Sequence, residues 1–197
     1  MLGFPAEEVR SWGDRYSFSI VDTPRDLEAI IPEAKGRSER ARLVAGFCRP
    51  WSAPLSDGKL VLDVTVDGWS RPWNAKAEKN KNYRPEEHPY TLWAETEVGE
   101  SQVGCIYSAQ GFEFDRVGVI WGPDLVWRDN GWVAQREHSF DSPVKARTAN
   151  MQHLVRNAYR VLLTRGISET RVLILDLETK GHVQETLKEA RNVTLEP

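Results

Sequence analysis

Three short segments of this chain are apolar at most positions, and helix-like segments lie between them. They are Ala41–Cys48, Val117–Trp121 and Arg171–Asp176. Such continuously apolar runs do not suit a half-exposed strand and are typical of central strands in a parallel sheet covered on both faces. Because strands and helices alternate along the chain, the sequence predicts an α/β fold with a mostly parallel sheet and helices on both faces.

Helix signals support this alternation. Thr23 is the expected N-cap of a first helix, and Pro24 is its first residue. Apolar residues recur at three- and four-residue steps from about Ala149 to Thr164, which predicts a longer amphipathic helix. A closing helix is expected over Gly181–Ala190. Further strands are predicted at Tyr16–Val21 and Val103–Tyr107, with an Asn-Gly hairpin turn at Asp129–Gly131. Residues 1–15 are expected to form a helix or an entry segment.

The region from Arg49 to Gly99 interrupts this order with five prolines and four tryptophans. Within it, Leu60–Val66 has the pattern of one arm of a hairpin. We therefore predict an insertion of short strands and ordered loops at about 49–99, packed down by the tryptophans. Its polar part, residues 75–88, is expected to be the most flexible.

Length and composition limit the classes of protein to which this chain can belong. The 197 residues suit a single domain with a real core. No apolar run approaches the ~20 residues that span a bilayer, and the N-terminus has no signal-peptide pattern. Cys48 and Cys105 are expected to be buried free thiols, which fits a cytoplasmic location. The net charge of −3 gives no global attraction to nucleic acid, and no ligand-like spacing predicts a metal site.

A Gln-Gly-x-Glu-x-Asp pattern lies directly before the Val117–Trp121 segment. Open parallel sheets bind ligands at the carboxyl ends of their strands, so we expect this loop to face such a crevice. Gly111 would let the backbone approach a phosphate or a neighbouring domain closely. Gln110 could bond a nucleotide, a sugar or a water, and Glu113 a ribose hydroxyl or an arginine. The alternative is a polar loop that only turns the chain.

The predicted amphipathic helix ends on Thr164-Arg165-Gly166. An arginine at such a tip can reach across a domain gap to the γ-phosphate and stabilise the charge that develops in phosphoryl transfer. The alternative is an arginine that complements the helix dipole. Arg160 and Arg156 lie one and two turns earlier, respectively, on roughly one face. With Arg147 and Arg171 in the same region, arginines are therefore concentrated locally although the whole chain is acidic.

A phosphate loop of the Gly-x-x-x-x-Gly-Lys-Ser/Thr type is absent from the sequence. The nearest segment, Asp57–Leu60, has Leu where the metal-binding hydroxyl belongs. The chain is therefore not expected to hydrolyse ATP by itself. Among the eight tryptophans, Trp51 and Trp73 are the candidates for stacking on nucleic-acid bases, although packing is the commoner use of any one Trp.

The combined pattern resembles the last two motifs of superfamily 1 helicases. It is carried by Ala41–Phe47, by Gly104–Leu125 and by Arg156–Gly166. It is most similar to a helicase-like family of unknown function, domain of unknown function 2075, which resembles the Schlafen-type DNA/RNA helicase domain. One departure is Ser108, two residues before Gln110, where many superfamily 1 relatives carry His or Thr.

This resemblance implies a RecA-like, P-loop NTPase-type fold and a second (C-terminal) helicase domain spanning residues 1–197. Arg165 would then be the catalytic arginine finger, and Gln110, Gly111, Glu113 and Arg160 would contact nucleotide. ATP and Mg²⁺ would be held by an N-terminal RecA-like domain, supplied in cis or in trans, and DNA or RNA would be a further partner. The alternative is a non-catalytic nucleic-acid or protein interaction module on the same fold.

Overall fold

The computed structural model describes residues 16–76, 82–88 and 92–192. The predicted entry segment 1–15 lies outside the described residues, as does part of the segment 75–88 that we expected to be flexible. Within the described part, the core is a five-stranded sheet in the order β1-β9-β6-β2-β5, parallel throughout. The strands are β1 (Ser17–Val21), β2 (Ala41–Ala45), β5 (Val103–Gly104), β6 (Phe114–Trp121) and β9 (Gly166–Ile174).

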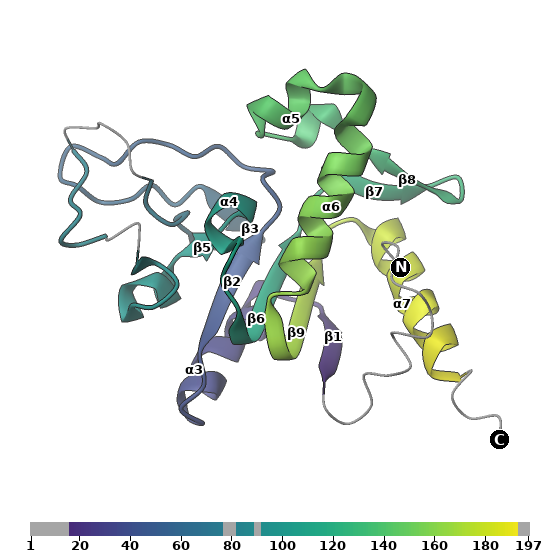
Figure 1. Cartoon of the computed structure of the whole chain (residues 1–197), viewed down its shortest axis with the longest axis horizontal. Coiled ribbons are helices and arrows are strands. Elements are labelled where there is room, and N and C mark those ends of the chain that lie inside the picture. Colours follow the sequence, from purple (N-terminus) through teal and green to yellow (C-terminus); the bar gives the residue numbers. More distant parts are fainter. Residues whose placement is uncertain (1–15, 77–81, 89–91, 193–197) are drawn as a thin grey trace.

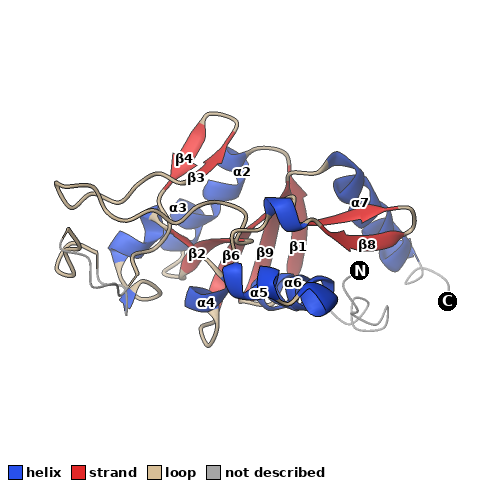
Figure 2. Cartoon of the chain, turned by 90° about the horizontal axis from the view of Figure 1, so that it is seen from above, coloured by secondary structure: helices blue, strands red, loops and turns tan. Residues whose placement is uncertain are grey.

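Helices cover both faces of this sheet (Figure 2), so the predicted α/β fold is confirmed, in an arrangement consistent with a RecA-like domain. On one face lie α2 (Pro24–Glu28) and α3 (Ile30–Lys35), and on the other lie α4 (Ile106–Ala109) and α6 (Met151–Leu163). The remaining helices are α5 (Ser142–Ala146), α7 (Leu177–Asn192) and the 3-10 turns η3 (Glu97–Ser101), η4 (Arg136–His138) and η5 (Thr148–Asn150).

Alternation along the central strands divides the core into two clusters. Val44, Val119 and Val172 share the α6 side with Tyr159 and Leu162. Their neighbours in sequence, including Ile120 and Leu173, pack on the other side with Leu27 and Ile30 of the α2–α3 layer. Both faces are thus apolar, which is why the central segments are hydrophobic at nearly every position.

Local signals in the sequence are confirmed at two points. Thr23 caps α2, because its hydroxyl oxygen accepts from the Asp26 N–H at 3.2 Å. The predicted hairpin joins β7 (Leu125–Arg128) to β8 (Gly131–Ala134), but its two turn residues are Asp129 and Asn130, which both have positive φ, and Gly131 is already paired with Arg128. This is the backbone that a two-residue hairpin turn requires.

Strand limits differ from prediction. The segment expected as a strand to Tyr107 leaves the sheet at Gly104 and continues as the single turn α4. Tertiary contacts explain the difference, since Ser108 Oγ accepts from the Cys105 N–H and the Tyr107 hydroxyl donates to Asp141. β9 also begins earlier than expected, at Gly166, because it pairs with Phe114 at the start of β6.

The region between β2 and β5 contains, among its described residues, the hairpin β3 (Val64–Val66) and β4 (Trp69–Arg71) together with η3. Buried Arg42 of β2 ties this region to the sheet by donating to the backbone carbonyls of Trp93 and Thr96. Cys48 and Cys105 are buried free thiols, as predicted. In the described ranges no helix is long and apolar enough to cross a membrane.

Candidate functional site

The loop that begins at Gln110 connects α4 to β6. The loop starts with a turn in which the Phe112 N–H donates to the Ala109 carbonyl at 3.2 Å. Gly111 has φ +91°, and a Cβ built there would meet nothing within 4 Å. The glycine is therefore required by the backbone and not by crowding. Gln110, Gly111 and Glu113 are all exposed.

The same loop is bonded to the turn that carries Arg165. The Phe114 N–H donates to the Arg165 carbonyl at 2.9 Å, and Arg165 Nη1 donates to the Phe112 carbonyl at 3.1 Å. Arg165 Nε also donates to the Val161 carbonyl at 3.0 Å, in the last turn of α6. The half-buried guanidinium thus holds backbone oxygens, and no carboxylate in the described part of the chain pairs with it.

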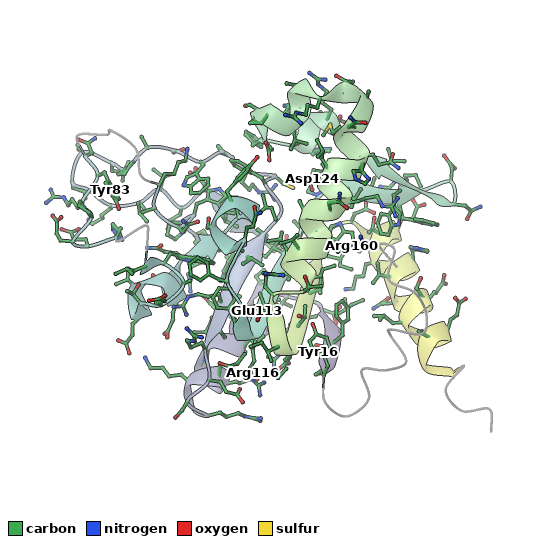
Figure 3. The ribbon with its side chains drawn as sticks, viewed as in Figure 1. Tyr16, Tyr83, Glu113, Arg116, Asp124 and Arg160 are labelled. Carbon is green, nitrogen blue, oxygen red and sulfur yellow. The ribbon has the colours of Figure 1, made fainter. Side chains whose placement is uncertain are left out.

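These contacts combine two of the alternatives drawn from the sequence. Arg165 does cap the carbonyl end of α6, as a dipole-complementing arginine would. It also joins α6 to the loop that starts at Gln110. Arg160 is exposed on α6 (Figure 3), whereas Arg156 is half-buried. Arg171, which belonged to the predicted arginine concentration, is held by Glu33 and Glu169.

The position of the loop corrects one expectation. We expected it at the carboxyl ends of the strands, but it leads into the amino end of β6, and Arg165 leads into the amino end of the adjacent β9. The cause is α4, which takes the chain out of the sheet after Gly104 before the loop returns to it. Figure 3 accordingly places Glu113 and Asp124 toward opposite ends of β6.

The carboxyl end of β6 is instead filled by a buried polar network. The Tyr159 hydroxyl donates to Asp124 Oδ1 at 2.6 Å and accepts from the Gly122 N–H at 2.9 Å. Cys48 Sγ lies 3.7 Å from the same hydroxyl. Two glycines make room, since a Cβ on Gly46 would lie 2.0 Å from Tyr159 Oη and one on Gly122 would lie 2.3 Å from Cys48 Sγ.

Burial dominates the electrostatics of this network. It raises the pKa of the Asp124 carboxyl, against the lowering effect of its hydrogen bonds with Cys48 and Tyr159. It also raises the pKa values of the Cys48 thiol and the Tyr159 hydroxyl well above their ordinary range. A thiol held in its protonated form is a poor nucleophile. The network therefore packs and positions the strand ends and has no accessible reactive group.

Trp73 does not fit the predicted stacking role, because it is 2% exposed. Its Nε1 donates to the Pro50 carbonyl at 2.7 Å, and its ring packs against Trp51 and Phe47. Trp51 is half-buried and also contacts Phe47 edge to face. Lys76 Nζ lies 4.8 Å from the Trp51 ring centroid.

Two exposed aromatic residues beside Trp51 were missed by the sequence analysis. Tyr107 is 56% exposed and Phe140 is 47% exposed. Tyr107 meets the Phe47 ring edge to face, and the Phe140 N–H donates to the Phe47 carbonyl at 2.8 Å. We call Phe47, Trp51, Tyr107 and Phe140 the aromatic patch. The sequence analysis identified Trp51 as a stacking candidate, but it assigned Tyr107 to a strand and found no signal at Phe140.

Asp141 organises the border of this patch. Its carboxylate accepts from the Tyr107 hydroxyl at 2.8 Å and from the Val144 N–H at 3.1 Å, which caps α5. Burial and the adjacent Asp141 raise the pKa of Tyr107 to about 12, so this phenol stays neutral. No group of three or more metal-binding side chains occurs within the described ranges.

The chain is similar in sequence to a protein family and to a yeast protein. A family model described as "Schlafen group 3, DNA/RNA helicase domain" matches residues 4–176. An uncharacterized protein of Saccharomyces cerevisiae (strain ATCC 204508 / S288c), YPL245W, is 25% identical over 194 residues. That alignment covers 89% of this chain but 40% of the yeast protein, so the chain spans less than half the length of its relative. No solved structure matches.

Proposed function

Since the chain belongs to the Schlafen group 3 DNA/RNA helicase domain family, we propose that it is the second RecA-like half of an ATP-driven nucleic-acid motor. In this proposal a first RecA-like domain, in cis or in trans, holds ATP and Mg²⁺, because this chain has no phosphate loop. The present domain contributes an arginine finger and the surface that closes over the nucleotide.

The observation that carries the proposal is the pairing of the Arg165 turn with the Gln110–Glu113 loop. Two hydrogen bonds join them across β6 and β9. An arginine finger acts from outside the domain that binds the phosphates, so it needs a rigid, exposed edge and not a pocket of its own. Because no carboxylate among the described residues pairs with Arg165, its charge is available for a phosphate.

The other predicted nucleotide contacts take supporting roles in the proposal. Gln110 and Glu113 are exposed polar groups that could orient a water, a ribose hydroxyl or a partner arginine. Gly111 leaves its backbone open to close approach. Arg160, exposed one turn before the end of α6, adds positive charge on the same helix. None of these groups needs to change fold to meet a neighbouring domain.

Kinetics of an Arg165 variant test this proposal. In the protein that carries both domains, Arg165→Ala should lower single-turnover ATP hydrolysis by on the order of 10³-fold or more, while ATP affinity falls much less. Arg165→Lys should rescue little, because an ammonium cannot reproduce the planar guanidinium fork. Arg25→Ala, at an exposed arginine of α2, is the control. Hydrolysis unchanged by Arg165→Ala would leave this residue a helix cap and refute the assignment.

Nucleic acid is the second partner in the proposal, and the aromatic patch is its best-supported contact. Exposed rings stack on bases with little sequence preference, and each stacked base is worth about 1–3 kcal/mol. Lys76 beside Trp51 supplies positive charge for the backbone. Trp73 would support Trp51 from beneath and would not itself touch a base.

Oligonucleotide binding tests this second part on the chain alone. Tyr107→Ala and Phe140→Ala should each weaken binding of a fluorescent single-stranded oligonucleotide by about 5- to 150-fold. Val98→Ala, at an exposed apolar residue of η3, is the control. Binding that is intact in both patch variants would exclude this surface. Nucleic-acid binding without any effect of Arg165 on hydrolysis would favour the alternative, a non-catalytic interaction module.

A further inference from the structure

One short segment of the insertion lies between the aromatic patch and α4. Residues 72–74 pair with Val103 of β5, since the Val103 N–H donates to Pro72 and the Asn74 N–H donates to Val103. On one side of this segment, Trp73 packs against Trp51 and Phe47. On the other, Asn74 faces α4. The segment therefore contacts both the aromatic patch and α4, the helix that leads into the Gln110–Glu113 loop.

Asn74 makes the contact with α4 through its buried amide. Its Oδ1 accepts from the Ser108 hydroxyl at 2.6 Å, and its Nδ2 donates to the Ala75 carbonyl at 3.1 Å. Asn74 is 4% exposed. Ser108 Oγ in turn accepts from the Cys105 N–H at 3.4 Å, at the start of α4. The Asn74 amide therefore fixes the hydroxyl that closes the helix cap.

The α4 helix is a single turn of four residues, and the Gln110–Glu113 loop follows it directly. An isolated turn is unstable in water, so tertiary contacts must set its position. Two of them come from different parts of the chain, the Ser108 bond to Asn74 and the Tyr107 bond to Asp141. Figure 1 shows α4 beside β5, with the chain continuing from it to the start of β6.

From this geometry we infer that Asn74 is a positioning residue that couples the aromatic patch to the Gln110–Glu113 loop. The inference rests on nucleic-acid binding at the patch, as proposed above. A base stacked on Tyr107 restrains α4 through this residue, and the Asn74–Ser108 bond restrains it through Ser108. The Gln110–Glu113 loop then samples fewer conformations, and this loss of conformational freedom couples the aromatic patch to the loop.

Hydrogen exchange of two loop amides tests this coupling on the chain alone. The Gln110 N–H donates to Ile106 at 3.1 Å and the Phe112 N–H to Ala109 at 3.2 Å, so both amides report whether α4 and the turn are closed. Adding a saturating single-stranded oligonucleotide to the wild type should slow exchange at both by about fivefold or more, as expected for a typical coupling between two sites.

Substitutions at Ser108 separate the coupling from the fold. Ser108→Ala should abolish the slowing, and Ser108→Thr, which keeps the hydroxyl, should restore most of it. Asn74→Leu, which removes the acceptor from the other side, should behave as Ser108→Ala does. Ser101→Ala is the matched control, because that hydroxyl bonds only Val98 within its own 3-10 turn.

The outcomes distinguish this inference from the proposed function. If the oligonucleotide binds the wild type but leaves both amides unchanged, the coupling is refuted while nucleic-acid binding stands. Slowing that is equal in the wild type, Ser108→Ala and Asn74→Leu would also refute it. Absence of oligonucleotide binding, followed by fluorescence anisotropy in the same samples, would overturn the proposed nucleic-acid surface and the coupling with it.

Discussion

The two ends of strand β6 are built in opposite ways. Before its first residue lies an exposed polar loop, which is anchored to Arg165 by the Phe114 N–H and by the Phe112 carbonyl. After its last residue lies a sealed network in which Tyr159, Asp124 and Cys48 exclude solvent. Polar residues alone therefore do not locate a site. The candidate functional edge is exposed, and its Arg165 has no carboxylate partner among the described residues, whereas the polar groups at the other edge bond one another.

This comparison predicts that the sealed end tolerates substitution least. Gly46→Ala would place a methyl group 2.0 Å from Tyr159 Oη, and a shift of this buried hydroxyl would break its bonds with Asp124 and Gly122. We expect the free energy of unfolding to fall by more than about 3 kcal/mol, the upper end of ordinary overpacking. Gly181→Ala in α7, where a Cβ meets nothing within 4 Å, should not destabilise. Chemical denaturation of both variants measures the difference.

Removing one hydroxyl from the same network should lower the free energy of unfolding by a somewhat smaller amount. Tyr159→Phe leaves Asp124 Oδ1 and the Gly122 N–H buried without this partner. A loss of about 3 kcal/mol is expected, because each unsatisfied buried group costs about 1–3 kcal/mol. Urea denaturation with an unchanged m-value checks this. A stability equal to that of the wild type would show that water reaches the network and that the end is not sealed.

At the exposed edge, substitution of a glycine should lower the free energy of unfolding through backbone strain only. Gly111→Ala should lose about 1–2 kcal/mol, because φ +91° is unfavourable for a residue with a Cβ. Gly68→Ala is the matched control, since Gly68 has φ +78° and also meets nothing within 4 Å. Equal losses by thermal denaturation are expected. In the two-domain protein, only Gly111→Ala should also slow ATP hydrolysis, and an equal effect of both would contradict a special role for the loop.

Acid should weaken a different contact at the carboxyl ends of the strands. Asp176, after β9, accepts two bonds from Arg128 and caps α7 through Thr179, and these bonds hold its pKa below the usual range. Its contribution to stability is present above about pH 3.9, the ordinary Asp pKa, and is lost as pH falls through the lower folded value. Between pH 5 and 2 the wild type should therefore lose more stability than Asp176→Asn.

Much of the fold could be predicted from the sequence because its signals are local. Continuous apolar segments identified β2, β6 and β9, and Thr23 with Pro24 identified the start of α2. The same logic failed at Val103–Tyr107, an apolar run that we predicted to be a strand. There the hydrogen bonds of Ser108 and Tyr107 to distant residues stabilise a helical turn, and no local pattern encodes them.

The residues of the candidate site could be predicted from the sequence, but the strand end at which they lie could not. The Gln110–Glu113 loop and Arg165 were identified from motifs and lie together in the structure. Their edge was misjudged, because the error over α4 reversed which strand end the loop meets. Trp73 was misjudged because its burial depends on Phe47 and Pro50, far from it in sequence. Phe140 carried no motif at all, and only tertiary structure brings it beside Tyr107.

The central claim is that the Arg165 side chain reaches across a domain gap and contacts a nucleotide held by another domain. The most direct test is a crystal structure of the two-domain protein with Mg²⁺, ADP and aluminium fluoride, which mimics the transferring phosphate. We predict that the Arg165 guanidinium releases the Phe112 carbonyl and lies about 3 Å from the fluoride ligands. A closed complex in which Arg165 still bonds Phe112 and Val161, with no contact to the mimic, would contradict the account.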